Sequence, residues 1–142
     1  MSNDISASLK TLRSAASHLN KLTDQANSSV ELVESFLSHE CRIGAHAFVQ
    51  VDDEGGDITQ YLEYRKIGSR YRIAVVYADE AGEDVKVTPW SDCSRDDKLE
   101  TIKKLPELLV ELLSKLNEQA IEAEKATETV HNVVKLLTGK EG

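Results

Sequence analysis

The side chains best suited to metal or redox chemistry are His39, Cys41, His46 and Cys93 in the 142-residue chain. Thiolate and imidazole are ligands that Zn²⁺ prefers, but structural zinc sites usually carry their cysteines in tight pairs such as C-x2-C. Here Cys41 has only a histidine close to it in sequence, and Cys93 lies far along the chain. We therefore predict structural cysteines and no metal ion. The third and last of our functional hypotheses is a small enzyme or a metal- or thiol-dependent sensor built on Cys41, Cys93 and the nearby histidines.

A second stretch, residues 52–63, superficially suggests a calcium-binding loop. Such a loop needs oxygen ligands at positions one, three and five and a glycine at position six. Position five is Gly56 and position six is Asp57, so the pattern fails. The sequence also contains no nucleophile elbow, phosphate-binding loop or dinucleotide-binding motif. It therefore predicts no catalytic residues and no cofactor, and a protein that is not an enzyme.

Charged residues are concentrated in two groups in the middle of the chain. Two glycine-containing loops hold the acidic group, which consists of Asp52, Asp53, Glu54, Asp57, Asp79, Glu80, Glu83 and Asp84. Around a predicted turn lies the basic group, Arg65, Lys66, Arg70 and Arg72. In an antiparallel meander the two groups should lie at opposite ends of the sheet, and each is a candidate binding surface. The net charge of −8 argues against direct binding of nucleic acid or of an anionic membrane.

Long helices should flank this region, because apolar residues repeat at the a and d positions of heptads at both ends of the chain. We call each such row of a and d residues a seam. The seam within residues 3–38 is Ile5, Leu9, Leu12, Ala16, Leu19, Thr23, Ala26, Val30, Val33 and Leu37. The seam within residues 94–138 is Leu105, Leu109, Leu112, Leu116, Gln119, Ala123, Ala126, Val130, Val133 and Leu137. Laid antiparallel so that paired numbers add up to 142, the seams place Thr23 opposite Gln119. We predict a coiled-coil-like hairpin of two long antiparallel helices, although the same layers could also form between two chains.

Between these helices, residues 44–89 alternate apolar and polar side chains, as β-strands do. A hairpin turning at Gly68-Ser69 pairs Leu62 with Val75 and gathers one continuous apolar face, which a shift of one residue would scatter. Further strands are expected at residues 45–51 and 85–88. The predicted fold is therefore α+β, a single domain over residues 1–142 with a three- to four-stranded antiparallel meander inserted between the helices.

The same hairpin register places Arg65 directly opposite Arg72. Like charges at opposing strand positions are destabilising, so an anionic group is expected beside them. Pro89 and Trp90 end the sheet region, and Trp90, the only tryptophan, is expected to anchor the packing there.

Local signals set the helix boundaries. The first helix should continue through residues 27–29, because its seam stays in phase across these poor helix formers. Ser94 with Asp97 forms a capping box. Pro106 predicts either a kink or a short helix followed by a long one, and Gly139 is a suitable helix end.

Both helices carry more apolar side chains than a two-stranded seam can bury. Those predicted to form an oligomer interface are Leu22, Leu32, Phe36, Leu108, Leu113, Ile121 and Val134. Such a wide apolar stripe needs a third or fourth partner, and the sheet can cover only part of it near one end. We therefore predict a homodimer that forms a four-helix bundle.

The composition, 40% hydrophobic and 30% charged, is typical of a globular protein, and no apolar run suggests a signal peptide or a membrane span. We expect a cytoplasmic protein with reduced thiols and no membrane contact. Our leading hypothesis is a non-catalytic protein-interaction module, an adaptor, regulator or inhibitor such as small bacterial or phage accessory proteins. The alternative is an acidic inhibitor that imitates nucleic acid through its two acidic loops.

Overall fold

The computed structural model describes residues 2–52 and 56–139. Its elements are, in chain order, α1 (Ser2–Ser35), the π-helical turn η1 (Phe36–Glu40), β1 (Ala47–Asp52), β2 (Thr59–Ile67), β3 (Arg70–Ala78), β4 (Asp84–Pro89), the 3-10 turn η2 (Trp90–Asp92), α2 (Arg95–Ile102) and α3 (Leu105–Thr138). The fold is α+β, with a four-stranded antiparallel sheet between two long helices.

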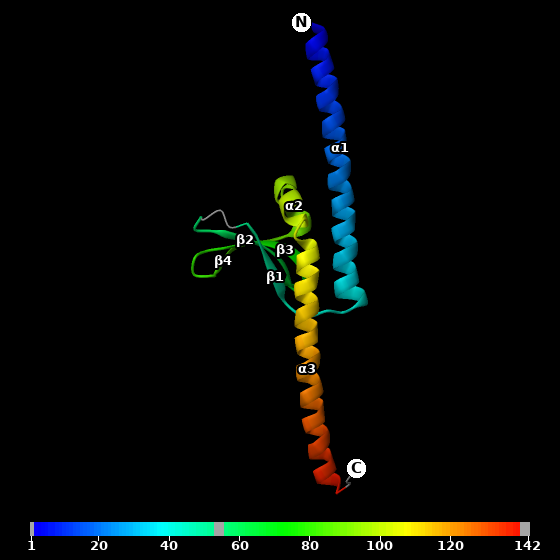
Figure 1. The fold of residues 1–142 in the computed structure, drawn as a ribbon, viewed down its shortest axis with the longest axis vertical. Helices are drawn as coiled ribbons and strands as arrows, with labels where there is room; N and C mark the ends of the chain where they lie inside the picture. The colour runs from blue at the N-terminus through cyan, green and yellow to red at the C-terminus, as the bar shows by residue number, and fades with distance from the viewer. Residues whose placement is uncertain (1, 53–55, 140–142) are drawn as a thin grey trace.

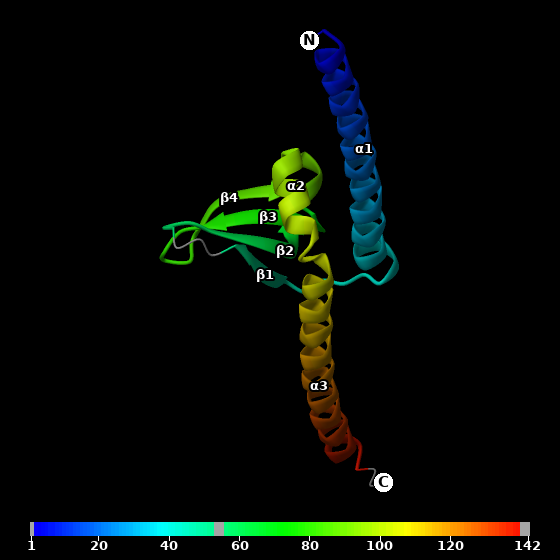
Figure 2. The same cartoon turned by 45° about the horizontal axis from the view of Figure 1, so that its top comes forward.

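The two long helices do not form the predicted hairpin within the chain. In Figure 1, α1 runs from the N-terminus to the middle of the molecule, and α3 continues in the same general direction to the C-terminus at the opposite end. They lie side by side only around the centre, where the sheet and α2 project to one side (Figures 1 and 2). The start of α1 and the end of α3, which the predicted hairpin brings together, therefore lie at opposite ends of an elongated molecule (Figure 1).

The sheet is the predicted meander, with strand order β1-β2-β3-β4. The hairpin register is confirmed, because Leu62 pairs with Val75 and Arg65 with Arg72. Gly68 opens the turn with a φ of 64°, which side chains other than glycine's rarely allow. β4 is slightly longer than expected and pairs with β3 alone.

Side chains from every layer share one core at the centre of the molecule. The sheet contributes the predicted apolar face, the helices contribute one stripe each, and Trp90 closes the end of the core. Its members with the least exposure include Leu62, Tyr64, Ile73, Val75, Trp90, Leu108 and Leu112. Trp90 also donates a hydrogen bond through Nε1 to Thr101 Oγ1 at 3.0 Å, so the buried indole N–H is satisfied. The expected anchoring role of Trp90 is thus confirmed.

Local sequence signals set most helix ends correctly. Ser94 caps α2 by accepting a hydrogen bond from the Asp97 N–H at 3.2 Å. Of the two expectations for Pro106, the structure shows a short helix followed by a long one, with the proline in the first turn of α3, where its missing N–H costs no helical bond. Gly139 ends α3 in the left-handed conformation. The first helix is continuous through residues 27–29.

Candidate interaction surfaces

The largest candidate surface consists of the parts of the long helices that extend beyond the sheet. We call residues 5–23 of α1 and residues 119–137 of α3 the arms. Most of their seam residues are exposed: Leu9 is 59% exposed, and Leu137 is 81% exposed, whereas Leu19 and Thr23 at the inner end of the α1 arm are half-buried. Also exposed are Ile5, Leu12, Val130 and Val133. Two stripes of apolar surface therefore lie uncovered at opposite ends of a single chain (Figure 1).

Most residues predicted at the oligomer interface are also exposed. On α1 and η1 these are Leu22, Leu32 and Phe36, and on α3 they are Leu113, Ile121 and Val134. Leu108 is the exception, because it is fully buried against the sheet of its own chain. The heptad pattern placed it beside the seam, whereas α3 turns that side toward the sheet. Leu108 is therefore a core residue rather than an exposed interface residue.

Two members of the basic group, Arg65 and Arg72, have acidic partners in different parts of the fold. Arg65 Nη1 lies 2.8 Å from Asp84 Oδ2 and 3.4 Å from Glu63 Oε1. Arg72 Nε instead lies 3.3 Å from Glu34 Oε1 on α1. The anionic groups expected beside the arginine pair are thus supplied by the chain itself.

Of the remaining basic residues, Lys66 and Arg70 have exposed side chains near the β2–β3 turn. They are the part of the basic group that is open to a partner. The predicted register distinguishes Arg65 and Arg72 as the pair that needs an anion, and so leaves Lys66 and Arg70 as the other two members of the group.

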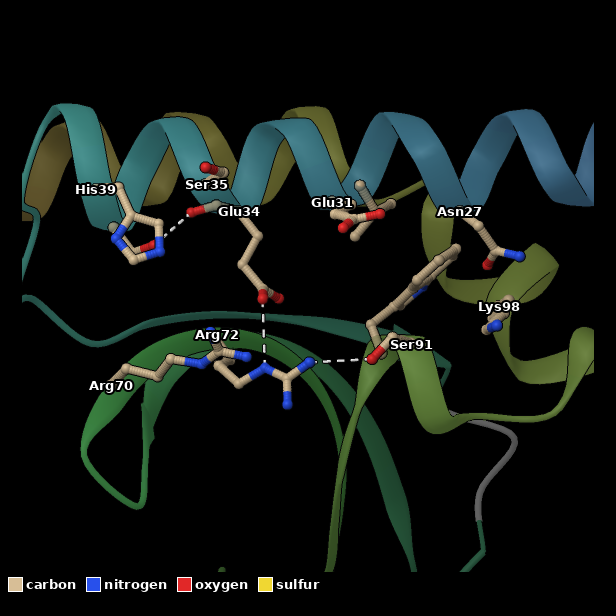
Figure 3. A pocket seen from close by; sticks show the side chains of 12 residues that line it. Asn27, Glu31, Glu34, Ser35, His39, Arg70, Arg72, Ser91 and Lys98 are labelled. Atoms are coloured by element: carbon tan, nitrogen blue, oxygen red, sulfur yellow. Dashed lines mark hydrogen bonds and ion pairs between the residues drawn. The ribbon is translucent and has the colours of Figure 1, made fainter.

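Glu34 attaches α1 to the edge of the sheet. Its Oε2 accepts the Ile73 N–H at 3.0 Å while Oε1 contacts Arg72, whose Nη2 also donates to Ser91 Oγ at 3.0 Å (Figure 3). β4 ends at Pro89, opposite Ala74, so the edge of β3 is uncovered at Ile73 and a helix side chain completes its hydrogen bonding. The arginine pair indicated that a carboxylate was needed, but nothing in the sequence identified Glu34.

A cavity of about 390 Å³ lies between α1, the edge of β3 and the start of α2 (Figure 3). Its polar lining residues include Asn27, Glu31, Glu34, His39, Arg70, Arg72, Ser91 and Lys98. Within the described part of the chain, the buried Oδ1 of Asn27 has no hydrogen-bond partner. The acidic lining residues lie on α1 and the basic ones mostly on β3 and α2, so the cavity as a whole does not favour a ligand of either charge.

The described members of the acidic group lie toward the end of the sheet that the meander predicts, although Asp84 contacts Arg65 of the basic group. β1 ends, and β2 begins, at the end of the sheet where the β3–β4 connection lies, opposite to the β2–β3 turn (Figure 1). Asp57, Glu80 and Glu83 are exposed. Asp79 Oδ1 accepts the Glu83 N–H at 2.9 Å and so stabilises its own turn, and Asp84 is the partner of Arg65. Asp53 and Glu54 lie outside the described residues, as does the side chain of Asp52.

The two cysteines occupy different environments. Cys41 is exposed, whereas Cys93 is half-buried, and its thiol lies 3.4 Å from the carbonyl oxygen of Pro89. Burial, followed by the nearby carboxylate of Asp97, raises the pKa of Cys93 to about 11, so this thiol stays protonated near neutral pH. His46 Nε2 lies 2.6 Å from Glu63 Oε1 at the outer face of the sheet. Within residues 2–52 and 56–139, no cluster of three or more His, Cys, Asp or Glu side chains is arranged to hold a metal ion.

Comparisons with known proteins provide no relative for this chain. No family model matches it, and neither a curated protein nor a solved structure shows significant similarity. In the described part of the chain, no helix is both long enough and apolar enough to cross a bilayer. Any statement about function therefore depends on the surfaces described above.

Proposed function

We propose that this protein is a non-catalytic interaction module, an adaptor, regulator or inhibitor, that acts through other protein chains bound to its arms. The observation that carries this proposal is the pair of uncovered apolar stripes on α1 and α3. Contiguous apolar surface of this kind is rare on monomeric proteins and marks sites of protein association. We expect the protein to act in the cytoplasm as a homodimer.

The central part of the molecule has a different role in this proposal. The sheet, α2 and the central halves of the long helices form a core that holds the arms in fixed directions, and the charged ends of the sheet remain available to a further partner. Lys66 and Arg70 at one end, and Asp57, Glu80 and Glu83 at the other, are the exposed charged residues best placed for this. Such charges mainly determine partner choice and the rate of association.

The decisive experiment compares the wild-type chain with a Leu9→Asp/Leu12→Asp variant, which introduces two charges into the exposed seam of α1. Thr11→Asp/Ser14→Asp is the matched control, because it adds the same charges on the opposite side of the same helix. We expect the wild type and the control to associate, either with themselves by light scattering or with a protein captured from lysate at several salt concentrations. The seam variant should lose this association while the near-ultraviolet circular dichroism of the buried Trp90 stays unchanged. A wild type that is monomeric at every concentration and captures nothing beyond the seam variant would refute the proposal.

The acidic loops support a second candidate function. Because both loops emerge at one end of the sheet, their exposed carboxylates could occupy a basic nucleic-acid-binding groove on a target protein (Figure 1). A Glu80→Gln/Glu83→Gln variant should then lose target binding and keep its fold, whereas the Leu9→Asp/Leu12→Asp variant should keep target binding. Unchanged binding by the loop variant would remove this candidate.

A further inference from the structure

The shape of the molecule imposes a simple symmetry requirement on any pairing of the arms. α1 and α3 are each 34 residues long, or about 51 Å at 1.5 Å per residue. Both run in the same general direction, and they extend to opposite ends from a shared centre (Figure 1). Suppose that a second copy is related to the first by a two-fold rotation about an axis that passes through the centre of the molecule, perpendicular to its long dimension. The second copy then runs in the opposite direction to the first. That operation brings α3 of the second copy to the end where α1 lies, running in the opposite direction.

The two seams fit each other in this orientation. Residues whose numbers add up to 142 form layers in which an a position meets a d position, as antiparallel coiled coils require. The outer layers would be Ile5 with Leu137, Leu9 with Val133, Leu12 with Val130, Ala16 with Ala126 and Leu19 with Ala123. Each of these residues lies in an arm, and all but the half-buried Leu19 are exposed in the single chain.

Polar residues agree with the same register. Thr23 and Gln119, the one polar member of each seam, meet in the next layer. A shift of one heptad would instead bury each of them against an apolar residue, which is costly without a hydrogen-bond partner. Beside the seams, Arg13 would face Thr127 and Glu122 would face Leu22, so neither of these charges meets a like charge. The partner that best fits both arms is therefore a second copy of this chain.

The layers nearer the centre cannot form between chains. Val30, Leu37 and Leu112 are already buried in the core of their own chain. Around the two-fold axis, the exposed apolar residues are Leu32, Phe36 and Leu113 on the other sides of the same helices. The register derived from the sequence thus applies only to the arms. At the centre, contact between the two chains would instead involve the exposed apolar residues beside the seams.

We propose that two copies of the chain exchange arms, so that α1 of each lies antiparallel beside α3 of the other, with paired arm residues whose numbers add up to 142. This inference rests on the proposed function, since it identifies the partner that the arms bind. The contact is isologous and occurs twice, once at each end of the dimer, which is the expected geometry of a closed two-fold assembly. Without the second copy, the outer seam residues of both arms stay exposed.

The test uses cysteine cross-linking between two different chains. In a Cys41→Ser/Cys93→Ala background, one chain carries Leu9→Cys and the other carries Val133→Cys, and the two are refolded together and treated with a mild oxidant. A disulfide requires Cα atoms within about 7 Å, so the mixed sample should give a product of twice the 15.7 kDa chain mass. Each chain alone should give none, because like positions lie at opposite ends of the dimer.

A mismatched pair tests the register itself. In this pair, Leu9→Cys is combined with Ala123→Cys in place of Val133→Cys. The second thiol is then ten residues, about 15 Å along the helix, from the position that the register pairs with residue 9. We expect the matched pair to give at least about tenfold more product than this pair. Equal yields from both pairs, or a product from the Leu9→Cys chain alone, would overturn the proposed register.

The outcomes also separate this inference from the proposed function. If no pair cross-links and the wild-type chain is monomeric, yet the Leu9→Asp/Leu12→Asp variant loses a captured protein, then the arms bind a different protein. That result overturns the exchanged dimer and leaves the interaction function standing. If the arms bind neither a second copy nor another protein, both fail.

Discussion

The central part of the molecule and its arms are built from the same heptad stripes, but their side chains end in opposite environments. Leu108 and Leu112 on α3 are buried, whereas Val130 and Val133, further along the same helix, are exposed. On α1, Val30 is buried and Leu9 and Leu12 are exposed. The stripe is therefore used twice, first by the chain's own sheet and then, in our proposal, by a second chain.

Length explains this division. Strands of 6–9 residues span roughly 20–30 Å, while each long helix spans about 51 Å. The sheet can cover only the part of each helix that crosses it. An amphipathic helix that extends beyond its sheet must find another partner or expose its apolar side to water. The predictions below test this contrast, beginning with the largest expected effect.

The centre should be far more sensitive to truncation than the arms. Leu108→Ala removes a side chain with 0% exposure and should lower the free energy of unfolding by about 3–5 kcal/mol through lost burial and a residual cavity. Leu136→Ala is the control on the same helix, since that side chain is 83% exposed, and it should change stability by less than about 0.5 kcal/mol. Urea unfolding at low protein concentration measures both. Equal losses would contradict the division into a centre and arms.

The arms should stabilise the protein only where chains associate. Leu12→Ala should lower the unfolding free energy by about 2 kcal/mol at concentrations where the wild type is dimeric, because the side chain is then buried. On dilution this difference should vanish, whereas the loss in Leu108→Ala should persist. Thermal unfolding over a wide concentration range measures both variants. A loss in Leu12→Ala that does not depend on concentration would show that the arm packs within its own chain.

Threonine hydroxyls provide a matched pair of polar tests. Thr101 Oγ1 accepts a hydrogen bond from the Trp90 indole N–H and donates one to the Asp97 carbonyl oxygen at 2.7 Å. The side chains of Thr101 and Trp90 are both buried. Thr101→Val should cost about 1–3 kcal/mol, because it leaves the indole N–H unsatisfied. Thr11→Val is the control, since the exposed Thr11 hydroxyl bonds only to Ala7 O one turn back in α1. A similar small change at both sites, measured by urea unfolding with tryptophan fluorescence, would argue against the buried bond.

The smallest effect should come from the cysteines at alkaline pH. Burial raises the pKa of Cys93 from 9.0 to about 11, so the folded state keeps a proton that the unfolded state releases first. Its contribution is therefore fully present below pH 9 and is lost as the pH rises toward 11. In a Cys41→Ser background, stability should fall more steeply over this range than in the same background with Cys93→Ala. Parallel curves would contradict this, as would equal reactivity of Cys41 and Cys93 toward a thiol reagent at pH 8.

Much of the sheet could be predicted from the sequence because its signals are local. Strand alternation together with the Gly68-Ser69 turn leaves one register that gathers the apolar side chains on one face, and the structure has that register. Ser94 and Gly139 likewise act on the backbone groups next to them. The need for an anion beside Arg65 and Arg72 was also visible, because paired strands place these residues opposite each other.

The strands, the hairpin register, most helix ends and the heptad seams follow from the amino-acid sequence alone, since each depends on residues a few positions apart or directly paired. The relative direction of α1 and α3, the burial of Leu108 and the role of Glu34 at the edge of β3 instead depend on how distant parts of the chain pack together. A heptad pattern states that a helix side will be covered, but it is equally satisfied by a sheet, by a helix of the same chain or by a helix of another chain. The short connection through Lys103 and Lys104 sets the direction in which α3 leaves the core, and that direction carries the two seams to opposite ends of the molecule.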